Sequence, residues 1–167
     1  LGMGLVAAMD IVDNILLKQY QTQKGLLLSR KPATAKAKEI IKKLDIQTPS
    51  IYHPIRDLSG GNIQKVLLGR ELDTNPEVLI TAYPVRGLDI NTCYKIYDLL
   101  NEEKKKGVAI LFIAEDLDSL IGLSDRIMVL SNGEVMGILD ARKATKEEIG
   151  LMMLGEKIKE TEGAYAV

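Results

Sequence analysis

A serine and two glycines near the middle of the 167-residue chain have the residue types and spacing to bind phosphate. Ser59, Gly60 and Gly61 stand directly before an apolar-periodic stretch, and this pattern predicts the start of a helix. The first N–H groups of a helix have no partner within it and carry partial positive charge, so they attract anions. Glycine lets a ligand approach the backbone, and the Ser59 hydroxyl adds a hydrogen bond. The alternative is a serine that only caps the helix.

The elements before this motif are predicted to be helical. Asp10 has the residue type of a helix cap, and Asp13 stands three places on, as in a capping box. A break over residues 25–29, followed by Pro32, separates this helix from a second one over residues 35–44. The apolar residues of the second helix fall on one face, namely Ile40, Ile41 and Leu44.

After about Pro76 the pattern changes to strands alternating with helices. Residues 91–106 predict a helix that stops at Gly107. The apolar run 108–114 predicts a strand that is covered on both faces. An Asn-Gly turn follows the run 127–130, so an antiparallel hairpin with residues 134–139 is expected at the sheet edge.

The end of the chain predicts one more helix. Thr145 and Glu148 have the spacing of a capping box, and Met152 and Met153 are expected to fill the core. The tail over residues 160–167 is expected to be loose.

Helices followed by strand–helix alternation predict an α/β fold, with a parallel sheet, flanking helices and an edge hairpin. We predict a helical subdomain over residues 1–75 and a sheet-containing part over residues 76–167. Together they form one domain, because 167 residues suffice for one core but not for two.

The composition of the chain limits the kinds of molecule that it is expected to bind. The net charge is −1 with acids and bases mixed along the chain, so no nucleic-acid partner is expected. The three lysines at 104–106 are predicted to form the solvated C-terminal end of a helix. Cys93 is the only cysteine, which fits a reducing compartment. No apolar run has transmembrane length, and the N-terminus lacks the basic flank of a signal peptide, so any membrane role is expected to act through a partner.

Residues 58–65, Leu-Ser-Gly-Gly-Asn-Ile-Gln-Lys, resemble the signature motif of ABC-transporter ATPases, in the form typical of sugar and nucleoside importers. Residues 75–80 and 84–89 resemble the Walker B strand and the D-loop. Residues 110–117 resemble the strand and turn of the switch histidine, and residues 124–127 also match. Several motifs in the family's order are stronger evidence than one. The resemblance is to the second nucleotide-binding half of fused importers, especially their nucleoside branch, which implies a partial P-loop NTPase core.

The family's catalytic positions are substituted here. Its Walker B strand ends in an Asp that helps to hold magnesium and a Glu that activates water, whereas this chain has Ala82 and Tyr83. At the switch-histidine position stands Glu115, whose charge would repel a γ-phosphate. The chain also contains no Walker A sequence, and it begins at Leu1 rather than Met, as expected of a piece of a longer protein. The resemblance therefore implies that the fragment alone is inactive and binds no nucleotide tightly.

The resemblance also implies what the signature motif does. In this family each of two ATP sites combines the Walker A loop of one half with the signature of the other. The residues implied to meet ATP on a partner half are Ser59, Gly60, Gly61 and Gln64, with Asp89 at the D-loop position across the dimer seam. ATP and Mg would belong to the complete transporter. The implied partners are another nucleotide-binding domain, transmembrane permease subunits and, indirectly, a substrate-binding protein, at the cytoplasmic face of the membrane.

Two other readings remain open. One is a non-hydrolytic regulatory or scaffold half that only dimerises with an active ATPase. The other is a soluble ABC-type ATPase of translation or DNA repair, which the neutral charge and the continuation Asn62-Ile63-Gln64-Lys65 disfavour. His53 is the only histidine, and without a second ligand near it we expect a surface or capping residue rather than a metal ligand.

Overall fold

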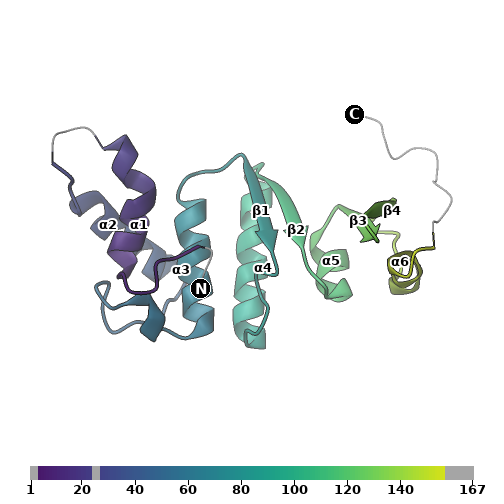
Figure 1. Cartoon of the computed structure of the whole chain (residues 1–167), viewed down its shortest axis with the longest axis horizontal. Coiled ribbons are helices and arrows are strands. Elements are labelled where there is room, and N and C mark those ends of the chain that lie inside the picture. The colour runs from purple at the N-terminus through teal and green to yellow at the C-terminus, as the bar shows by residue number, and fades with distance from the viewer. Residues whose placement is uncertain (1–3, 24–26, 157–167) are drawn as a thin grey trace. The chain divides into compact units, whose positions relative to one another are not determined.

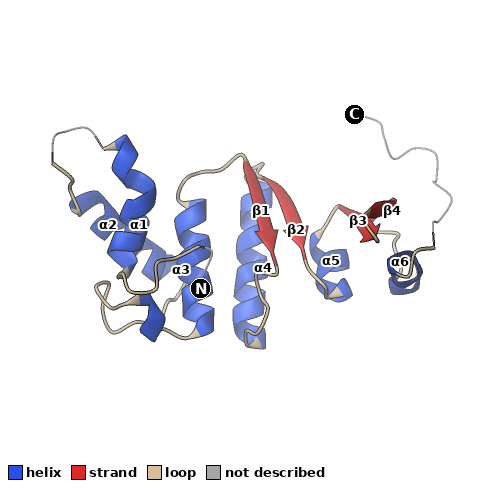
Figure 2. Cartoon of the chain, viewed as in Figure 1, coloured by secondary structure: helices blue, strands red, loops and turns tan. Residues whose placement is uncertain are grey.

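A computed structural model describes residues 4–23 and 27–156 of the chain. Its elements are mainly helices in the first half and strands alternating with helices in the second (Figure 1; Figure 2). The chain forms two compact units, which are Leu1–Leu79 with Pro84–Ile110 and Ile80–Tyr83 with Leu111–Val167. The predicted subdomain boundary after residue 75 stays a prediction, and the two units are described separately.

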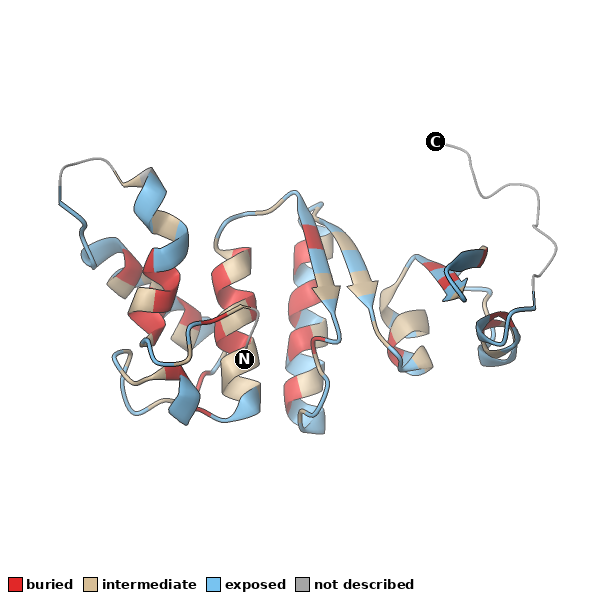
Figure 3. Cartoon of the chain, in the orientation of Figure 1, coloured by how far each residue is buried: buried red, intermediate tan, exposed pale blue. Residues whose placement is uncertain are grey.

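Helices build most of the first unit, and three of them pack against one another around its core. Fully buried aliphatic side chains form this core, among them Ile11, Ile15, Ile55 and Val66 (Figure 3). The helices are α1 (Ile11–Gln19), η1 (Tyr20–Thr22), α2 (Lys31–Lys43), η2 (Ile55–Asp57), α3 (Gly60–Leu72) and α4 (Ile90–Lys105).

The first two helices begin for identifiable reasons. Asp10 caps α1 as predicted, since its Oδ1 accepts a hydrogen bond from the Asp13 N–H at 2.7 Å. The Asp13 carboxylate, predicted to reach back to the cap, lies 2.7 Å from the Arg30 guanidinium. Helix α2 begins at Lys31, earlier than predicted, and Pro32 lies in its first turn rather than before it. Proline is tolerated there because the N–H that it lacks would have no partner within the helix.

A two-stranded parallel sheet connects to the helices through α4. Strands β1 (Val78–Ala82) and β2 (Ala109–Ile113) run in the same direction (Figure 2), which confirms the predicted parallel sheet. The prediction that β2 is covered on both faces is wrong, because Leu111 is 48% and Ile113 is 40% exposed. In the described chain β2 pairs only with β1. A paired strand covers an edge of β2, whereas covering its faces would require other elements to pack on the sheet.

An antiparallel hairpin and two helices make up most of the second unit. The helices are α5 (Leu117–Leu123) and α6 (Lys146–Met153), and the strands are β3 (Arg126–Ser131) and β4 (Glu134–Asp140). The hairpin and its turn form as predicted, with φ of 50° at Asn132 and 81° at Gly133. Positive φ at both residues is what a two-residue hairpin turn requires. The prediction that the hairpin lies at the edge of the parallel sheet is wrong, because in the described chain β3 and β4 form a two-stranded sheet of their own.

Helix α6 packs against the hairpin through Ile149 and Met152, which are almost fully buried. The predicted capping box of Thr145 and Glu148 is present at its start. The prediction that Met153 fills the core is wrong, because its side chain is 51% exposed. Consecutive helical residues point about 100° apart, so only one of the two methionines faces the hairpin. The tail at 160–167 lies outside the described residues.

Candidate functional site

Ser59 caps the helix that carries the predicted phosphate-binding residues. Helix α3 begins at Gly60, as expected, and the Ser59 Oγ accepts from the Asn62 N–H at 3.4 Å. Ser59 and Gly60 are exposed, while Gly61 is half-buried. The first turn of α3 therefore faces solvent with the serine hydroxyl and the glycine backbone accessible, as an anion site at a helix N-terminus requires.

The Asn62 side chain links Ser59 to the loop that precedes the motif. Its Nδ2 donates to the Ser59 Oγ at 2.9 Å, and its Oδ1 accepts from the Gln47 N–H at 2.9 Å. Asn62 therefore makes a hydrogen bond on each side of its amide, one to the cap and one to the backbone of the loop. This bridge was not predicted from the sequence.

Thr92 connects the same motif to the predicted D-loop residue. A Cβ on Gly61 would lie 3.3 Å from the Thr92 Cγ2 and 3.4 Å from its Oγ1. Thr92 is buried in the first turn of α4, whose N-cap is Asp89. The structure thus brings the signature glycine and Asp89 together through Thr92 within the first unit.

Both carboxylate oxygens of Asp89 are used within the chain. Oδ1 accepts from the Thr92 N–H at 3.0 Å, and Oδ2 accepts from the Thr92 hydroxyl at 2.7 Å. The hydroxyl bond, followed by the backbone bond, holds the pKa of Asp89 below its ordinary value of 3.8. Asp89 is exposed and is therefore a fixed negative charge at neutral pH.

Gln64 follows Gly60 and Gly61 by one helical turn on α3. Residues three and four apart are neighbours on a helix surface, so its half-buried side chain lies on the face of the two glycines. The five residues implied by the family resemblance are therefore all located at or beside the N-termini of α3 and α4.

A charged loop anchors these two helices behind the motif. The buried Lys65 donates its Nζ to the Asp45 carbonyl at 3.0 Å, and the Asp45 carboxylate lies 2.7 Å from the Lys95 Nζ. Burial lowers the pKa of Lys65. Beside these groups is a pocket of about 320 Å³ that is lined by both apolar and charged residues. Its lining comprises Lys43, Leu44, Asp45, Lys65, Leu68, Lys95, Ile96, Asp98, Leu99 and Glu102.

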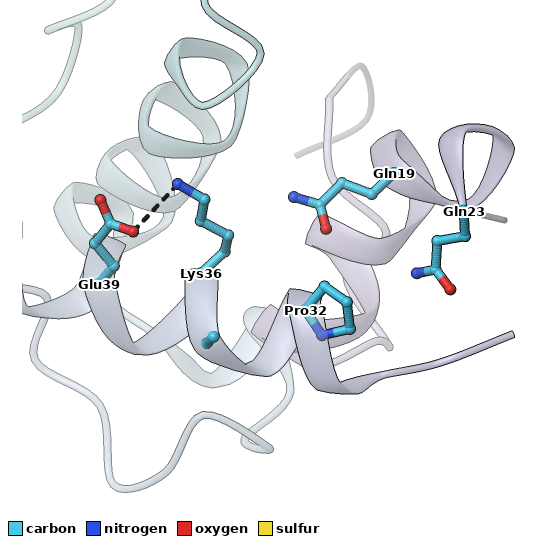
Figure 4. A pocket seen from close by; sticks show the side chains of 6 residues that line it. Gln19, Gln23, Pro32, Lys36 and Glu39 are labelled. Atoms are coloured by element: carbon cyan, nitrogen blue, oxygen red, sulfur yellow. Dashed lines mark hydrogen bonds and ion pairs between the residues drawn. The ribbon is translucent and has the colours of Figure 1, made fainter.

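A second pocket of about 500 Å³ lies on the helices of the same unit (Figure 4). An ion pair between Lys36 and Glu39 at 3.2 Å borders it, and Lys36 also lies 2.8 Å from Asp73. Its other lining residues are Gln19, Gln23, Pro32 and Ala35. None of the predicted phosphate-binding residues lines this pocket.

The three substituted catalytic positions lie at the carboxyl ends of β1 and β2, in the second unit. Ala82 ends β1, and Tyr83 follows it with a φ of 52° and donates its N–H to the Ile113 carbonyl at 2.8 Å. Glu115 stands two residues beyond the end of β2. The structure therefore groups these three positions, but it places them in a different unit from the signature motif.

The described residues contain no candidate metal site. Over residues 4–23 and 27–156, no group of three or more His, Cys, Asp or Glu side chains could hold an ion. His53 lies on the surface with 34% of its side chain exposed, and its Nε2 is 3.7 Å from the Asp57 carboxylate. Within the same described ranges, no helix combines the length and apolar character needed to cross a membrane.

Three contacts at the candidate site escaped the sequence analysis, and two of them had a local signal. Asp89 precedes Thr92 by three residues, which is the spacing of an N-cap and its first-turn partner. Ser59 precedes Asn62 by the same interval, so a polar side chain at that place could reach back to the cap. The contact of Thr92 with Gly61 had no such signal, because it joins segments about 30 residues apart.

Known proteins match the chain along most of its length, although no family model does. The xylose import ATP-binding protein XylG of Moorella thermoacetica is 40% identical over 92% of this chain. The guanosine import ATP-binding protein NupO of Bacillus subtilis is 38% identical over 94% of it. The ribose import ATP-binding protein RbsA of Clostridium perfringens is 41% identical over 91% of it. The chain spans only 31% of the length of each of these relatives.

Solved structures match the fold. The dimeric structure of MJ0796, described as a bacterial ABC transporter cassette, superposes with a TM-score of 0.70 at 25% identity. The match covers 84% of this chain and 60% of that one. A dimer of the same cassette bound to ADP and Pi gives a TM-score of 0.71 at 25% identity.

Proposed function

Because the chain belongs to the ABC-transporter ATPases and matches the C-terminal part of importers for sugars and nucleosides, we propose that it couples ATP to import of such a solute. Its signature motif (residues 58–65) would complete an ATP site held on a partner nucleotide-binding domain. The proposal rests above all on the exposed first turn of α3, with its accessible serine hydroxyl and glycine backbone.

The residues present fit the phosphate end of ATP. The Ser59 hydroxyl and the Gly61 N–H can each donate to an oxygen of the γ-phosphate, and the helix N-terminus adds favourable charge. Gly60, which is exposed, leaves room for the nucleotide to approach, and Gln64 borders the same face. Asp89 would face the partner across the seam and help to arrange the partner's site.

The chain's own site fits hydrolysis poorly. Of the three substituted positions, Ala82 has no metal-binding atom, and Tyr83 has a phenol in place of the carboxylate that would activate water. Glu115 offers a carboxylate, but its charge would oppose that of the γ-phosphate. We therefore propose that the partner half holds magnesium and activates the attacking water, and that this half contributes its signature motif.

The proposed partners follow from this role. A second nucleotide-binding domain would provide the nucleotide, and permease subunits would tie the pair to the cytoplasmic face of the membrane, with a substrate-binding protein acting indirectly. Two of the matched structures are dimers of cassettes, which supports the pairing.

ATP hydrolysis by the complete ATPase that contains these residues tests the proposal. Ser59→Ala removes one phosphate donor together with a helix cap, and we expect hydrolysis to fall about tenfold or more. Thr145→Ala is the matched control, because it removes a comparable cap from α6 far along the sequence. The control should lower stability by about 1 kcal/mol and leave hydrolysis unchanged.

The alternative is a scaffold half that only dimerises with an active ATPase, and the substituted catalytic positions favour it. It predicts that Ser59→Ala and Thr145→Ala behave alike, with hydrolysis intact in both. Gly61→Asp also tests the motif, but a side chain there meets Thr92 at 3.3 Å. Ser59→Ala is therefore the cleaner of the two variants.

A further inference from the structure

The backbone of Gln47 fixes which way the Asn62 amide points. A backbone N–H can only donate, so the Asn62 atom that it meets at 2.9 Å must be the carbonyl oxygen. The amide nitrogen then faces the Ser59 Oγ at 2.9 Å. The orientation of this side chain is thus determined by the chemistry of its two neighbours.

The same logic decides the role of the Ser59 hydroxyl. The amide nitrogen of Asn62 only donates, so the Ser59 oxygen must accept from it. A hydroxyl has two acceptor lone pairs and one O–H donor, and the Asn62 backbone N–H approaches the oxygen as well, at 3.4 Å. The O–H that remains is directed away from Asn62. Because Ser59 is exposed, that donor is accessible to a ligand.

The loop that carries Gln47 is held at several points. The Gln47 Nε2 donates to the Asp45 Oδ1 at 2.8 Å, and the Asp45 carboxylate also pairs with Lys95 on α4 at 2.7 Å. The Asp45 carbonyl accepts from the buried Lys65 of α3 at 3.0 Å. The N–H that orients Asn62 is therefore positioned by contacts to two helices.

We propose that Asn62 is a positioning residue that presents the Ser59 hydroxyl outward as a hydrogen-bond donor for a phosphate oxygen. Phosphate oxygens at the nucleotide end only accept, so a serine held in its donating orientation is matched to them before binding. Preorganised donors avoid the cost of reorienting when the ligand arrives. This inference rests on the proposed function, because it deepens the role of the same motif.

A double-mutant cycle in the complete ATPase tests the proposal, with the KM for ATP as the readout. Asn62→Asp has nearly the same size and can still accept from Gln47, but its second oxygen cannot donate to Ser59. It would accept the serine O–H instead and turn the hydroxyl inward. We expect the KM to rise about fivefold or more with Ser59 present, by the loss of one charge-assisted hydrogen bond. Combined with Ser59→Ala, the same change should raise the KM less, because only the repulsion between the new carboxylate and the phosphate remains.

Asn62→Ala separates charge from orientation. It introduces no carboxylate, and we expect a smaller rise in KM that disappears in the Ser59→Ala background. Thermal unfolding of each variant identifies any loss of folding, which would change active protein rather than KM. Equal effects of either Asn62 variant in both backgrounds would overturn the inference alone. If Ser59→Ala itself leaves hydrolysis and KM unchanged, the proposed function fails, and the inference fails with it.

Discussion

Gly61 lies close enough to the side chain of Thr92 that a Cβ at position 61 would be 3.3 Å from the Thr92 Cγ2. Gly61 is in the first turn of α3 and Thr92 is in the first turn of α4. Thr92 is buried and makes two hydrogen bonds to Asp89, so it has little freedom to move aside. Position 61 therefore has room for a glycine but little room for a larger residue.

Gly61→Ala should destabilise the protein even though alanine is the better helix former. The added methyl group overpacks the site against Thr92, and we expect a loss of about 1 kcal/mol in the free energy of unfolding. Thr92→Ser removes the Cγ2 methyl group and keeps the hydroxyl, so the loss from Gly61→Ala should be smaller in that background. Urea unfolding of the four proteins in this cycle measures the coupling. Equal losses in both backgrounds would show that the contact does not limit the site.

Asp89→Ala should lower both stability and hydrolysis. Loss of the cap on α4 should lower the free energy of unfolding, as at other Asp N-caps. Asp116 is a suitable control, since it caps α5 with a similar pair of hydrogen bonds to Ser119. Chemical unfolding should rank Asp89→Ala and Asp116→Ala close together, whereas ATP hydrolysis by the complete ATPase should fall more with Asp89→Ala. A matching fall in hydrolysis for the two variants would remove any special role for Asp89.

Acid should weaken the contact of Asp89 with Thr92. The hydroxyl of Thr92 holds the folded pKa of Asp89 below its ordinary value of 3.8. The contribution of the Asp89–Thr92 hydrogen bond to stability is therefore complete above pH 3.8, and it is lost as the pH falls through the lowered pKa of Asp89. Thr92→Val removes the hydroxyl bond and keeps the shape. We expect the free energy of unfolding in urea to be lower for Thr92→Val than for the wild type at neutral pH. The difference should be smaller at about pH 3. An equal difference in the free energy of unfolding at both pH values would mean that the bond does not act through the charge of Asp89.

Tyr83→Gly should stabilise the protein. Tyr83 has a φ of 52°, a conformation that costs a residue with a side chain about 1 kcal/mol, and the residue is 43% exposed. Asn75→Gly is the control, because Asn75 also has a positive φ, of 48°, but asparagine tolerates that conformation. Thermal unfolding should show a gain for Tyr83→Gly and little change for Asn75→Gly. A loss of stability with Tyr83→Gly would indicate that the ring makes contacts worth more than the backbone strain.

The exposed residues of β1 should promote self-association of the isolated chain. Val78 is 60% and Ile80 is 67% exposed, whereas Leu79 between them is buried at 8%. Changing both exposed residues to threonine should reduce association with little effect on stability. Leu79→Ala, the contrasting change, should cost about 2 to 5 kcal/mol. Light scattering together with unfolding curves distinguishes the two effects. An isolated chain that stays monomeric and resists heating would contradict this expectation.

Local sequence signals determined where several elements begin and turn. Asp10, Ser59 and Thr145 each accept a backbone hydrogen bond within the next three residues, so cap chemistry alone predicts these helix starts. The Asn-Gly pair at 132–133 likewise predicts the hairpin, since both residues adopt a positive φ. These features depend on residues a few positions apart, and the sequence shows them directly.

Tertiary structure decided which faces are covered and which segments meet. The apolar pattern of β2 predicts a buried strand, but burial depends on what packs against it, and Leu111 and Ile113 stay exposed here. Nothing in the spacing of residues 47, 61, 62 and 92 shows that they lie together. Their contacts require α3, α4 and the preceding loop to pack against one another. The sequence alone thus predicted a phosphate-binding motif, and the packing of distant segments decided how its serine and glycine are held.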